Sequence, residues 1–536
     1  MWTRIEGISE SFRAGTTRLG AVRMSSAPPL RLPKRAPHPW LLRAMLAPLD
    51  RILAFIGSRY TAFIWLVTSV PPQILALLGA WRAVRAAHQA RRKVPAYQRL
   101  LADHRVSAED LRWLRLPLTD KDAYVRRFSL EERCLNGRLP DHDVAMDESS
   151  GSTGIPHNWV RSLRERETSH TFISHFARHC FGNEPFVTIN AFSMGAWATG
   201  INMGIALQRI GTVKSTGPDV DKILSTLDVL GTKYRYLLCG YPPFLKLLID
   251  SAKERGFSLA DFSLMALVGG EGMSEGLRDY LIPYFSKVYS GFGATDLEIG
   301  IAGESPISVA IRREARRNER LREAVFGHDS RLPMLFQYNP LNHHVFVGHE
   351  GELIFTITRL EVLSPRIMYN LHDEGGVATF HEMEERLGSA GRKLGDIAPS
   401  GKKIVKLPFL WVYGRKDSTL SVMGANIYPE DIEQALYGEP ELAVRTHSFC
   451  LSLVEDQDGG VRPCFSFEIR GEITNELRSE FENRLPESIR LFNTDFRVAM
   501  KEHAATATPI VRLFALGTGP FAADAGRIKQ TRILHS

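Results

Sequence analysis

Short apolar runs and longer amphipathic runs alternate through the middle of the chain. The apolar runs at 187–190, 236–239, 264–268 and 287–289 are typical of buried strands, and the runs at 160–181, 243–255 and 274–285 are predicted to be helices. This alternation favours a mainly parallel sheet with helices on its faces. A strand expected at 351–356 opens an antiparallel region, and a helix expected at 430–437 belongs to a new unit. We therefore predict an α/β fold with a large domain followed by a small, mobile α+β domain.

The same pattern divides the chain into four parts. Residues 1–40 are rich in Arg, Ser and Pro, lack the apolar core of a secretory signal and are predicted to be a disordered arm. Residues 41–93 form an apolar and basic helical extension, residues 94–413 the large domain and residues 414–536 the small one. The alternative for the arm is an over-long start, with Met24 or Met45 as the initiator.

The run from 60 to 81 contains no charged residue and is flanked by Arg59 and Arg82. Its length is enough to cross a bilayer, but Pro71 and Pro72 would break a single helix. Two short helices fit better, as a hairpin at a membrane surface with its tryptophans and arginines at the level of the headgroups. The alternative is a hairpin buried against the large domain.

Charge and cysteine usage describe the setting of the protein. Residues 1–93 carry 15 Lys or Arg and three acids, about +12, and the whole chain is +7, so the remainder is about −5. The basic character therefore belongs to the extension, which suits an anionic membrane surface, and we expect no nucleic-acid partner. Five cysteines without a C-x-x-C pair argue against a disulfide framework or a zinc ribbon. We expect a cytoplasmic protein, and the extension adds peripheral contact with the inner face of the membrane.

A loop rich in hydroxyl groups and glycine is the central chemical feature of the sequence. It consists of Ser149, Ser150, Gly151, Ser152, Thr153 and Gly154. The backbone N–H groups of such a loop can surround phosphate oxygens, hydroxyls add donors, and glycine permits a close approach. No G-K-[ST] ends it, so it is not a Walker A loop. Taken alone, such a string is more often a flexible surface loop.

Two further motifs directly follow predicted strands. Gly269, Gly270 and Glu271 come after the strand at 264–268, and residues 290–296 come after the strand at 287–289. Ligands of parallel sheets bind beyond the carboxyl ends of the strands. Both motifs are therefore predicted to reach the same crevice as the loop at 149–154. Asp373 follows another strand, where it either holds a pair of sugar hydroxyls or is a turn residue.

Two segments have both a functional and a structural interpretation. Residues 192–204 combine small residues with Phe192, Met194, Trp197 and Met203, and this composition suits either the lining of an apolar pocket or tight helix packing. The six arginines between 311 and 323 predict a solvated helix face, with an anionic partner as the alternative.

Taken in order, these pieces resemble the adenylate-forming superfamily of acyl- and aryl-coenzyme A ligases, and most closely phenylacetate–coenzyme A ligase and the related capsule-biosynthesis branch. The resemblance covers roughly residues 90–536. Its motifs are V-P-x-Y at 94–97, L-P-x-T-x-K at 116–121, S-S-G-S-T-G at 149–154, N-A-F-S-M-G at 190–195, G-G-E at 269–271, G-F-G-A-T-D at 291–296, G-E-L-x-F-T at 351–356 and G-R-K-D-x-x-L-x-V-x-G-x-N-I-Y-P at 414–429. The last is the most specific, and the ordered set is stronger than any one motif.

The resemblance implies an ATP- and Mg²⁺-dependent ligase. Such an enzyme activates a small carboxylic acid as an acyl-AMP, because a carboxylate alone has no good leaving group, and then passes the acyl group to a thiol. The implied thiol is coenzyme A. The alternatives are transfer to a carrier-protein phosphopantetheine or to an amine, and a weakly catalytic, membrane-associated member of the family that acts in envelope biosynthesis.

The resemblance also assigns roles to matching residues. Residues 149–154 would hold the ATP phosphates, and Gly269, Gly270 and Glu271 would form the adenine pocket with Phe292 and Gly293. Thr295 would contact the α-phosphate, Asp296 would bind magnesium, and Asp373 would bind the ribose with help from Arg415. Asp417 would be the hinge of the small domain, and Lys529 the tail lysine that stabilises the transition state of adenylation.

Three departures from the family pattern concern this machinery. Asp296 stands where the family has a glutamate, which shortens the reach to a metal by one carbon. Asn370, Leu371 and His372 replace the usual residues before the ribose aspartate. In the tail, Arg527 stands where a lysine is usual and Lys529 comes two positions later. Either Lys529 acts after a small alignment shift or Arg527 takes its place, with the charge but without the compact ammonium group.

Overall fold

The computed structural model describes residues 39–107, 116–148, 157–196, 198–329, 331–399, 403–415, 420–422, 425–455, 461–502, 504–524 and 532–534. Nearly all of the predicted arm lies outside these residues. So do the predicted phosphate loop (Ser149 to Gly154), Trp197, Asp417, Arg527 and Lys529, while Arg415 is described by its backbone only.

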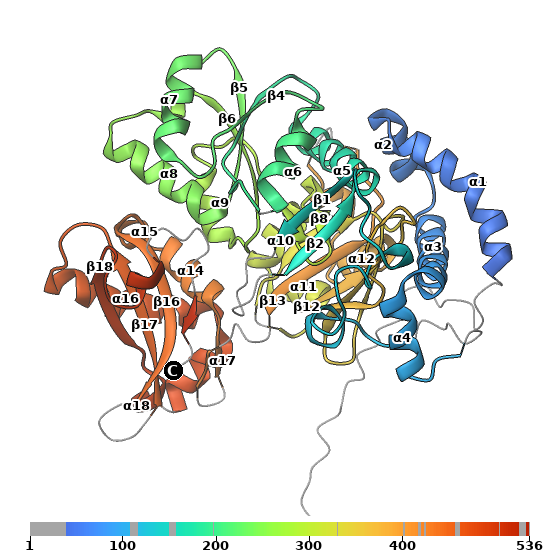
Figure 1. Ribbon diagram of the computed structural model, residues 1–536. Coiled ribbons are helices and arrows are strands. Elements are labelled where there is room, and N and C mark those ends of the chain that lie inside the picture. Colours follow the sequence, from blue (N-terminus) through green and yellow to red (C-terminus); the bar gives the residue numbers. More distant parts are fainter. Residues whose placement is uncertain are drawn as a thin grey trace, which may run out of the picture.

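An eleven-stranded sheet forms the large domain (Figure 1), with the strand order β10-β11-β12-β13-β9-β8-β7-β6-β5-β3-β4. All pairs among β3–β7 are parallel, and all other pairs are antiparallel. The strands are β3 (Val187–Asn190), β4 (Thr212–Ser215), β5 (Arg235–Gly240), β6 (Ser263–Gly269), β7 (Val288–Ala294), β8 (Glu298–Gly303), β9 (Met334–Tyr338), β10 (His343–Val347), β11 (Glu352–Ile357), β12 (Tyr369–Ala378) and β13 (Phe409–Arg415).

The α/β class is confirmed, and the sheet is mixed. Its parallel half matches the predicted alternation, because each of β3, β4, β5 and β6 is followed by a helix that crosses over to the next strand. The short connections between β7 and β8 and between β10 and β11 leave no room for a crossover, so these neighbouring strands are antiparallel. β13 runs to Arg415, two residues into the segment predicted to open the small domain.

Helices cover the two halves of the sheet and enclose separate cores. Helices α5–α9 and strands β3–β9 share the largest cluster of buried side chains, and α10–α13 pack on β9, β12 and β13. The helices are α5 (Leu163–Phe181), α6 (Ala198–Leu207), α7 (Val220–Leu230), α8 (Pro242–Glu254), α9 (Glu275–Leu281), α10 (Pro306–Arg317), α11 (Glu319–Phe326), α12 (Phe380–Ser389) and α13 (Leu394–Ile397). A separate hairpin of β1 (Val144–Glu148) and β2 (Asn158–Ser162) flanks the predicted phosphate loop.

The N-terminal extension is helical. It consists of α1 (Pro39–Gly57), α2 (Tyr60–Ser69) and α3 (Pro72–Lys93), followed by α4 (Pro95–Asp103). Pro71 and Pro72 separate α2 from α3, as predicted, but α3 then continues as one helix through the basic segment that ends at Lys93. No helix within the described part of the chain is long and apolar enough to cross a bilayer by itself, and α1 and α2, which would suffice together, are bent by 116°.

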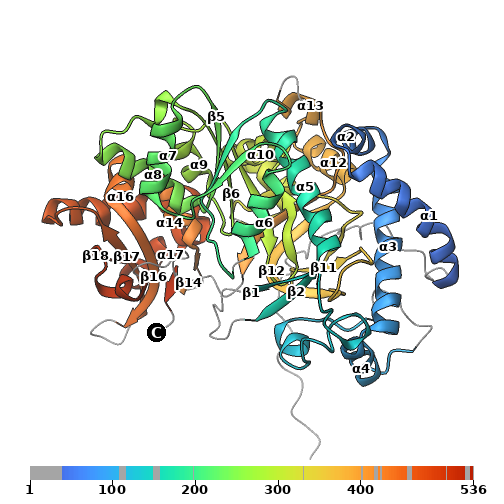
Figure 2. The same cartoon turned by 45° about the horizontal axis from the view of Figure 1, so that its top comes forward.

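The small domain folds around a four-stranded sheet with the order β18-β17-β16-β19. Figure 2 shows it beside α8 and α9 of the large domain. Its elements are β14 (Leu420–Val422), β15 (Ala425–Ile427), α14 (Pro429–Tyr437), α15 (Pro440–Arg445), β16 (Thr446–Glu455), β17 (Val461–Ile469), α16 (Asn475–Phe492), α17 (Thr494–Glu502), α18 (Ala504–Ala507), β18 (Ile510–Ala515) and β19 (Ile533–Leu534). All five cysteines of the chain are buried, and none of them forms a disulfide.

Several local predictions differ from the structure. The helix expected from residue 160 begins at Leu163, because Asn158–Ser162 pairs with β1 and Ser162 caps the helix in a capping box with Glu165. Residues 290–294, expected in a loop, belong to β7, and Asp373 lies within β12. The arginine-rich stretch is two helices, in which Arg312 is buried and forms an ion pair with Glu275, so it is not a uniformly solvated face.

Candidate active site

A cavity of about 1290 Å³ lies where the parallel strands end, with α14 of the small domain on one side. Residues from many separate parts of the sequence, between Lys121 and Arg532, line it. The predicted ligand-binding residues among them are Gly269, Gly270, Glu271, Phe292, Gly293, Thr295, Asp296 and Asp373. The structure therefore brings together every predicted nucleotide-binding segment whose side chains it describes.

Gly270 makes the turn out of β6 into the cavity. Its φ is +84°, a region that side chains disfavour, and a Cβ there would lie 2.7 Å from the ring of Tyr241. The loop from Gly269 to Glu271 thus lies closely against Tyr241, so that this ring and the backbone of the loop form one wall of the cavity.

Apolar and aromatic side chains line another part of the cavity. Phe172, Ile173 and Phe176 come from α5, and Tyr241 precedes α8, where its ring meets Phe192 edge to face at 5.3 Å between centroids. Of the predicted pocket residues, Phe192 and Met203 line the cavity. Met194 is not among the lining residues, and its sulfur lies beside Gly200.

Asp296 is held by three side chains from distant parts of the chain. The hydroxyl of Tyr369 donates to Asp296 Oδ2 at 2.9 Å, and Lys121 Nζ lies 3.3 Å from the same oxygen. Arg366 Nε donates to the Asp296 carbonyl at 2.8 Å. Burial and the neighbouring carboxylate raise the pKa of Tyr369 well above its ordinary value, so the phenol keeps its proton and remains a donor.

Arg161 connects the loop of Thr295 and Asp296 to the hairpin that precedes the predicted phosphate loop. Its guanidinium donates to the carbonyl of Thr295 at 2.5 Å and to that of Leu297 at 2.6 Å. Its Nε donates to Asp147 Oδ2 at 2.7 Å, and both side chains are buried. One buried arginine therefore fixes the backbone on both sides of Asp296 relative to the end of β1.

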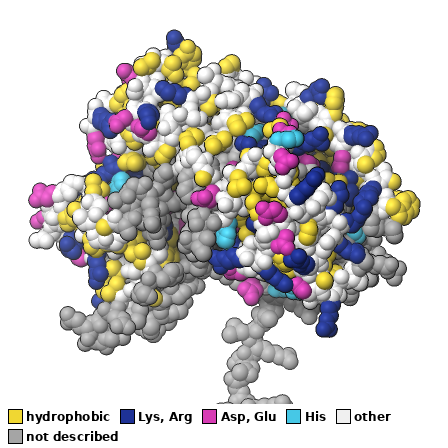
Figure 3. Space-filling model, viewed as in Figure 1, with side chains coloured by type: hydrophobic (Ala, Val, Ile, Leu, Met, Phe, Trp, Pro, Cys, Tyr) yellow, Lys and Arg dark blue, Asp and Glu magenta, His cyan; other side chains and the backbone are white. Residues whose placement is uncertain are grey.

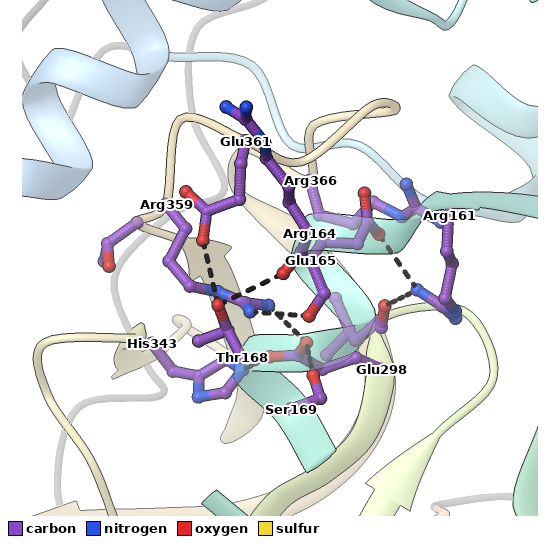
Figure 4. A network of polar contacts seen from close by, with 12 residues as sticks. Arg161, Arg164, Glu165, Thr168, Ser169, Glu298, His343, Arg359, Glu361 and Arg366 are labelled. Atoms are coloured by element: carbon purple, nitrogen blue, oxygen red, sulfur yellow. Dashed lines mark hydrogen bonds and ion pairs between the residues drawn. The ribbon is translucent and has the colours of Figure 1, made fainter. Parts of the chain in front are cut away.

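A buried network of charges supports the start of β8, directly after this loop (Figure 4). Glu298 forms ion pairs with Arg359 and His343, and Ser169 of α5 donates to it at 2.5 Å. Burial disfavours the charged carboxylate, but Arg359 and His343 outweigh that effect and hold the pKa of Glu298 well below its ordinary value. The carboxylate is therefore ionised, and it ties β8 to α5.

Asp373 lies in β12 directly opposite Arg415 of β13 in the antiparallel register. The two residues predicted to bind one sugar are thus neighbours at the edge of the cavity. The preceding residue, His372, has a φ of +62°, and the side chain of Asn370 accepts a hydrogen bond from its N–H at 2.8 Å. Asn370 and His372, which depart from the family pattern, thus form a local turn that places Asp373.

Polar and aromatic contacts hold the small domain against the large one. Lys246 of α8 is buried, lies 2.8 Å from Asp250 and donates to the carbonyl of Thr446 at 2.9 Å. The rings of Tyr280 and Tyr437 are 5.8 Å apart. Five residues of α14 and its neighbour Arg532 line the cavity, so the small domain contributes to its wall.

Four residues around Asp296 had no role assigned from the sequence: Lys121, Arg161, Arg366 and Tyr369. Lys121 was visible only as part of a motif. Thr119, buried beside it, donates to the carbonyl of Ile367 at 2.8 Å and pins this segment to the strand that begins with Tyr369. Only Arg161 left a signal in the sequence. It is a charged residue that directly follows the apolar Trp159 and Val160, and such a position can indicate a buried charge with a structural role.

Comparison with known proteins gives the fold. No protein-family model and no curated protein sequence matches the chain. Among solved structures, 2-hydroxyisobutyryl-CoA ligase in its postadenylation state, in complex with 2-HIB-AMP, is similar with a TM-score of 0.64 and 13% identity, over 88% of this chain and 91% of that one. The chain has the fold of this ligase. The same ligase in its thioesterification state, with CoA, is similar with a TM-score of 0.51 and 12% identity, over the same shares of the two chains.

Proposed function

We propose that this protein is an ATP-dependent acid–thiol ligase that activates a carboxylic acid as an acyl-adenylate and transfers the acyl group to coenzyme A. The observation that carries the proposal is the convergence of Gly269–Glu271, Phe292–Asp296 and Asp373 on one cavity, within the fold of an adenylate-forming ligase. Fold alone would not suffice, because one fold hosts many functions. The predicted nucleotide-binding residues whose side chains the structure describes are among those that line the cavity.

In the first half-reaction, an oxygen of the substrate carboxylate attacks the α-phosphorus of ATP. A new acyl–O–P bond forms, and the bond to pyrophosphate breaks. Negative charge on the phosphoryl oxygens grows within reach of Thr295 and Lys121, which both line the cavity. Donors that are already fixed in place stabilise such charge most effectively. In the second half-reaction, the sulfur of the thiol attacks the acyl carbon, and AMP leaves.

Asp296 suits a magnesium ion that arrives with the nucleotide. Its carboxylate is the oxygen ligand that Mg²⁺ prefers, and the phosphates supply further ligands. A magnesium ion held there would neutralise charge on the phosphates. Lys121, 3.3 Å from this carboxylate, holds it in place toward the cavity. In the C-terminal tail, we propose Lys529 as the catalytic lysine, with Arg527 as the alternative.

The wall formed by Phe172, Ile173, Phe192 and Tyr241 suits an acid with an apolar or aromatic body. This is compatible with the phenylacetate–coenzyme A ligase branch that the motifs resemble. We further infer that the small domain has the orientation that belongs to the adenylation half of the catalytic cycle. The support is the higher TM-score against the postadenylation state, 0.64, than against the thioesterification state, 0.51, of one and the same ligase.

The test is pyrophosphate release by the purified full-length protein with ATP, Mg²⁺ and a panel of aryl and aliphatic acids. We expect release that depends on the acid, and an acyl-CoA product when coenzyme A is added. If a phosphopantetheinylated carrier protein or an amine is acylated and no acyl-CoA forms, that molecule is the acceptor in place of coenzyme A. No release with any acid would overturn the proposal.

A matched pair of variants connects this activity to the cavity. Asp373→Ala removes the carboxylate expected to bind the ribose hydroxyls, and hydrogen bonds to a charged group are worth about 1.5–3 kcal/mol each. We therefore expect the KM for ATP to rise at least tenfold. Asp228→Ala, on the exposed side of α7, removes the same charge away from the cavity and should leave the KM unchanged.

A further inference from the structure

Helix α1 is apolar around most of its circumference, although only one side of it is covered. Leu42, Leu46, Leu49, Leu53 and Ile56 repeat at intervals of four and three residues and pack into the molecule beside α2 and α3. The stripe one residue earlier, with Leu41, Met45, Ile52 and Phe55, is exposed. A soluble helix normally carries polar residues on that side.

Large exposed hydrophobic side chains also lie on the two helices that follow α1. Together with Trp40 they include Trp65 of α2 and Ile74 at the start of α3, and we call these seven residues, from Trp40 to Ile74, the α1–α2 face. Among the described residues, twenty large hydrophobic side chains are exposed, and seven of them belong to this face. Such a concentration marks an interaction surface, whereas single exposed hydrophobic residues are normal.

The charges that accompany the face are positive. Arg43, Arg51 and Arg59 are exposed along it, and the Arg59 guanidinium lies 3.8 Å from the centre of the Phe55 ring. The one acid between residues 39 and 71 is Asp50, which forms ion pairs with Arg82 and Arg85 on the covered side of the helix. Figure 3 shows hydrophobic and basic side chains next to each other along the right-hand margin, where Figure 1 draws α1.

We propose that the α1–α2 face docks on the surface of a lipid bilayer with anionic headgroups. Arginines attract such headgroups, tryptophans favour the interface, and the apolar stripe enters the boundary of the acyl chains. Because α1 and α2 are bent by 116° relative to each other, they do not form one continuous helix that could cross the bilayer, and the proposed contact is peripheral. In both views α1 is at the outer edge of the molecule, away from the small domain (Figures 1 and 2).

Charge excludes the two other occupants that the chain itself offers. A second copy that met this face in a two-fold dimer would bring arginines against arginines, because such an interface uses the same surface on both subunits. Residues 1–38 carry seven Lys or Arg and two Glu, so they have the same sign as the face and would be repelled by it. The same charge adds to the attraction of an anionic membrane.

The face is firmly attached to the catalytic part of the molecule. His175 Nε2 of α5 donates to the carbonyl of Gly57 at 2.9 Å, and burial lowers the pKa of this histidine, so it is neutral near pH 7. Phe63 of α2 packs against Phe172 of α5, with 6.4 Å between ring centroids. Phe172 also lines the cavity. A bilayer bound at the face is therefore separated from the cavity by two packed helices.

The test is flotation of the full-length protein with vesicles of phosphatidylcholine, and of phosphatidylcholine with 30% phosphatidylglycerol, at low and high salt. We expect binding to the anionic vesicles that weakens with salt. Ile52→Ser with Phe55→Ser should weaken it at least tenfold. Gln in place of Arg43, Arg51 and Arg59 should weaken it about 100-fold, because each basic residue near the surface contributes about 1 kcal/mol.

The matched control is Val229→Ser with Leu491→Ser, two apolar side chains that are more exposed than Ile52 and Phe55 but lie elsewhere. It should bind like the parent, and all variants should unfold at the parent's temperature. The proposal is overturned if the parent does not float with either vesicle, or if the Ile52/Phe55 variant floats like the parent. Resistance to alkaline carbonate would show insertion across the bilayer, and loss of a dimer in the Ile52/Phe55 variant without vesicle binding would show that a second copy covers the face.

Discussion

Arg161 provides the sharpest test of how the site is built. Replacing it with methionine would leave the buried Asp147 carboxylate without its ion pair, and the carbonyls of Thr295 and Leu297 without their donor. Breaking a buried ion pair by removing one partner costs about 3–5 kcal/mol, and each buried acceptor left unsatisfied adds about 1–3 kcal/mol. This sum is a large part of the roughly 5–15 kcal/mol that keeps a domain folded. We therefore expect Arg161→Met to be poorly folded.

Arg161→Lys separates positioning from stability. Lysine keeps a positive charge near Asp147, but one ammonium group cannot reproduce the fork with which arginine reaches two carbonyls and a carboxylate. We expect the free energy of unfolding to fall by about 1–3 kcal/mol. The loop of Thr295 and Asp296 should lose its fixed position, so that kcat for adenylation falls at least tenfold while the KM for the acid changes little.

The assay is single-turnover pyrophosphate release per folded molecule, with urea unfolding of the same preparations. Arg164→Lys is the control, since Arg164 lies one turn further along the chain, is exposed and does not contact the loop. The reasoning is refuted if Arg161→Lys is no slower than Arg164→Lys once the unfolded fraction is subtracted, or if its defect lies wholly in KM.

Three further predictions concern the tail, the hinge and one buried carboxyl group. Lys529→Ala should abolish formation of the acyl-adenylate but spare thiolysis of a supplied acyl-AMP; the same result for Arg527→Ala alone would move the catalytic role by two residues. Asp417→Pro, which fixes φ and restricts the preceding residue, should spare adenylation and stop thioester formation, whereas equal loss of both would indicate misfolding. Burial raises the pKa of Asp431 from 3.8 to about 6, so the folded state binds this proton more tightly than the unfolded state. The contribution of this carboxyl group to the free energy of unfolding is complete below pH 3.8 and is lost as the pH rises toward 6. The loss amounts to about 3 kcal/mol. Asp431→Asn should therefore stabilise the small domain in urea at pH 7 but not at pH 3.5, and an equal effect at both pH values would contradict this.

The elements with a clear repeating pattern of apolar residues were predicted well. Segments whose structure depends on contacts with distant residues were not. The strand Val187–Asn190 was predicted to the residue, and all four of its side chains are buried. Residues 160–162 were taken for helix because their pairing with β1, which places Arg161 opposite Ala145, is invisible in a local pattern. The strand character of 290–294 was hidden by Gly291 and Gly293. In the structure, Gly293 allows β7 to approach β8 closely.

The candidate site was predicted in its chemistry but not in its support. The motifs located Thr295, Asp296 and Asp373, since each follows an apolar run in a fixed order. They could not indicate that Tyr369 and Arg366 hold Asp296, because these contacts join residues about seventy positions apart. They also suggested Met194 as a pocket residue, although its side chain lies beside Gly200 and does not line the cavity.

The burial of all five cysteines has a consequence for the proposed chemistry. An acyl-adenylate reacts with any thiolate that reaches it, and a thiol is a nucleophile only after it loses its proton. Burial raises the pKa of Cys134 to about 11 and raises that of Cys239 further, so both remain protonated at neutral pH. None of the five is exposed. The protein therefore offers its own activated product no accessible thiol, and acylation of its cysteines does not compete with the incoming thiol.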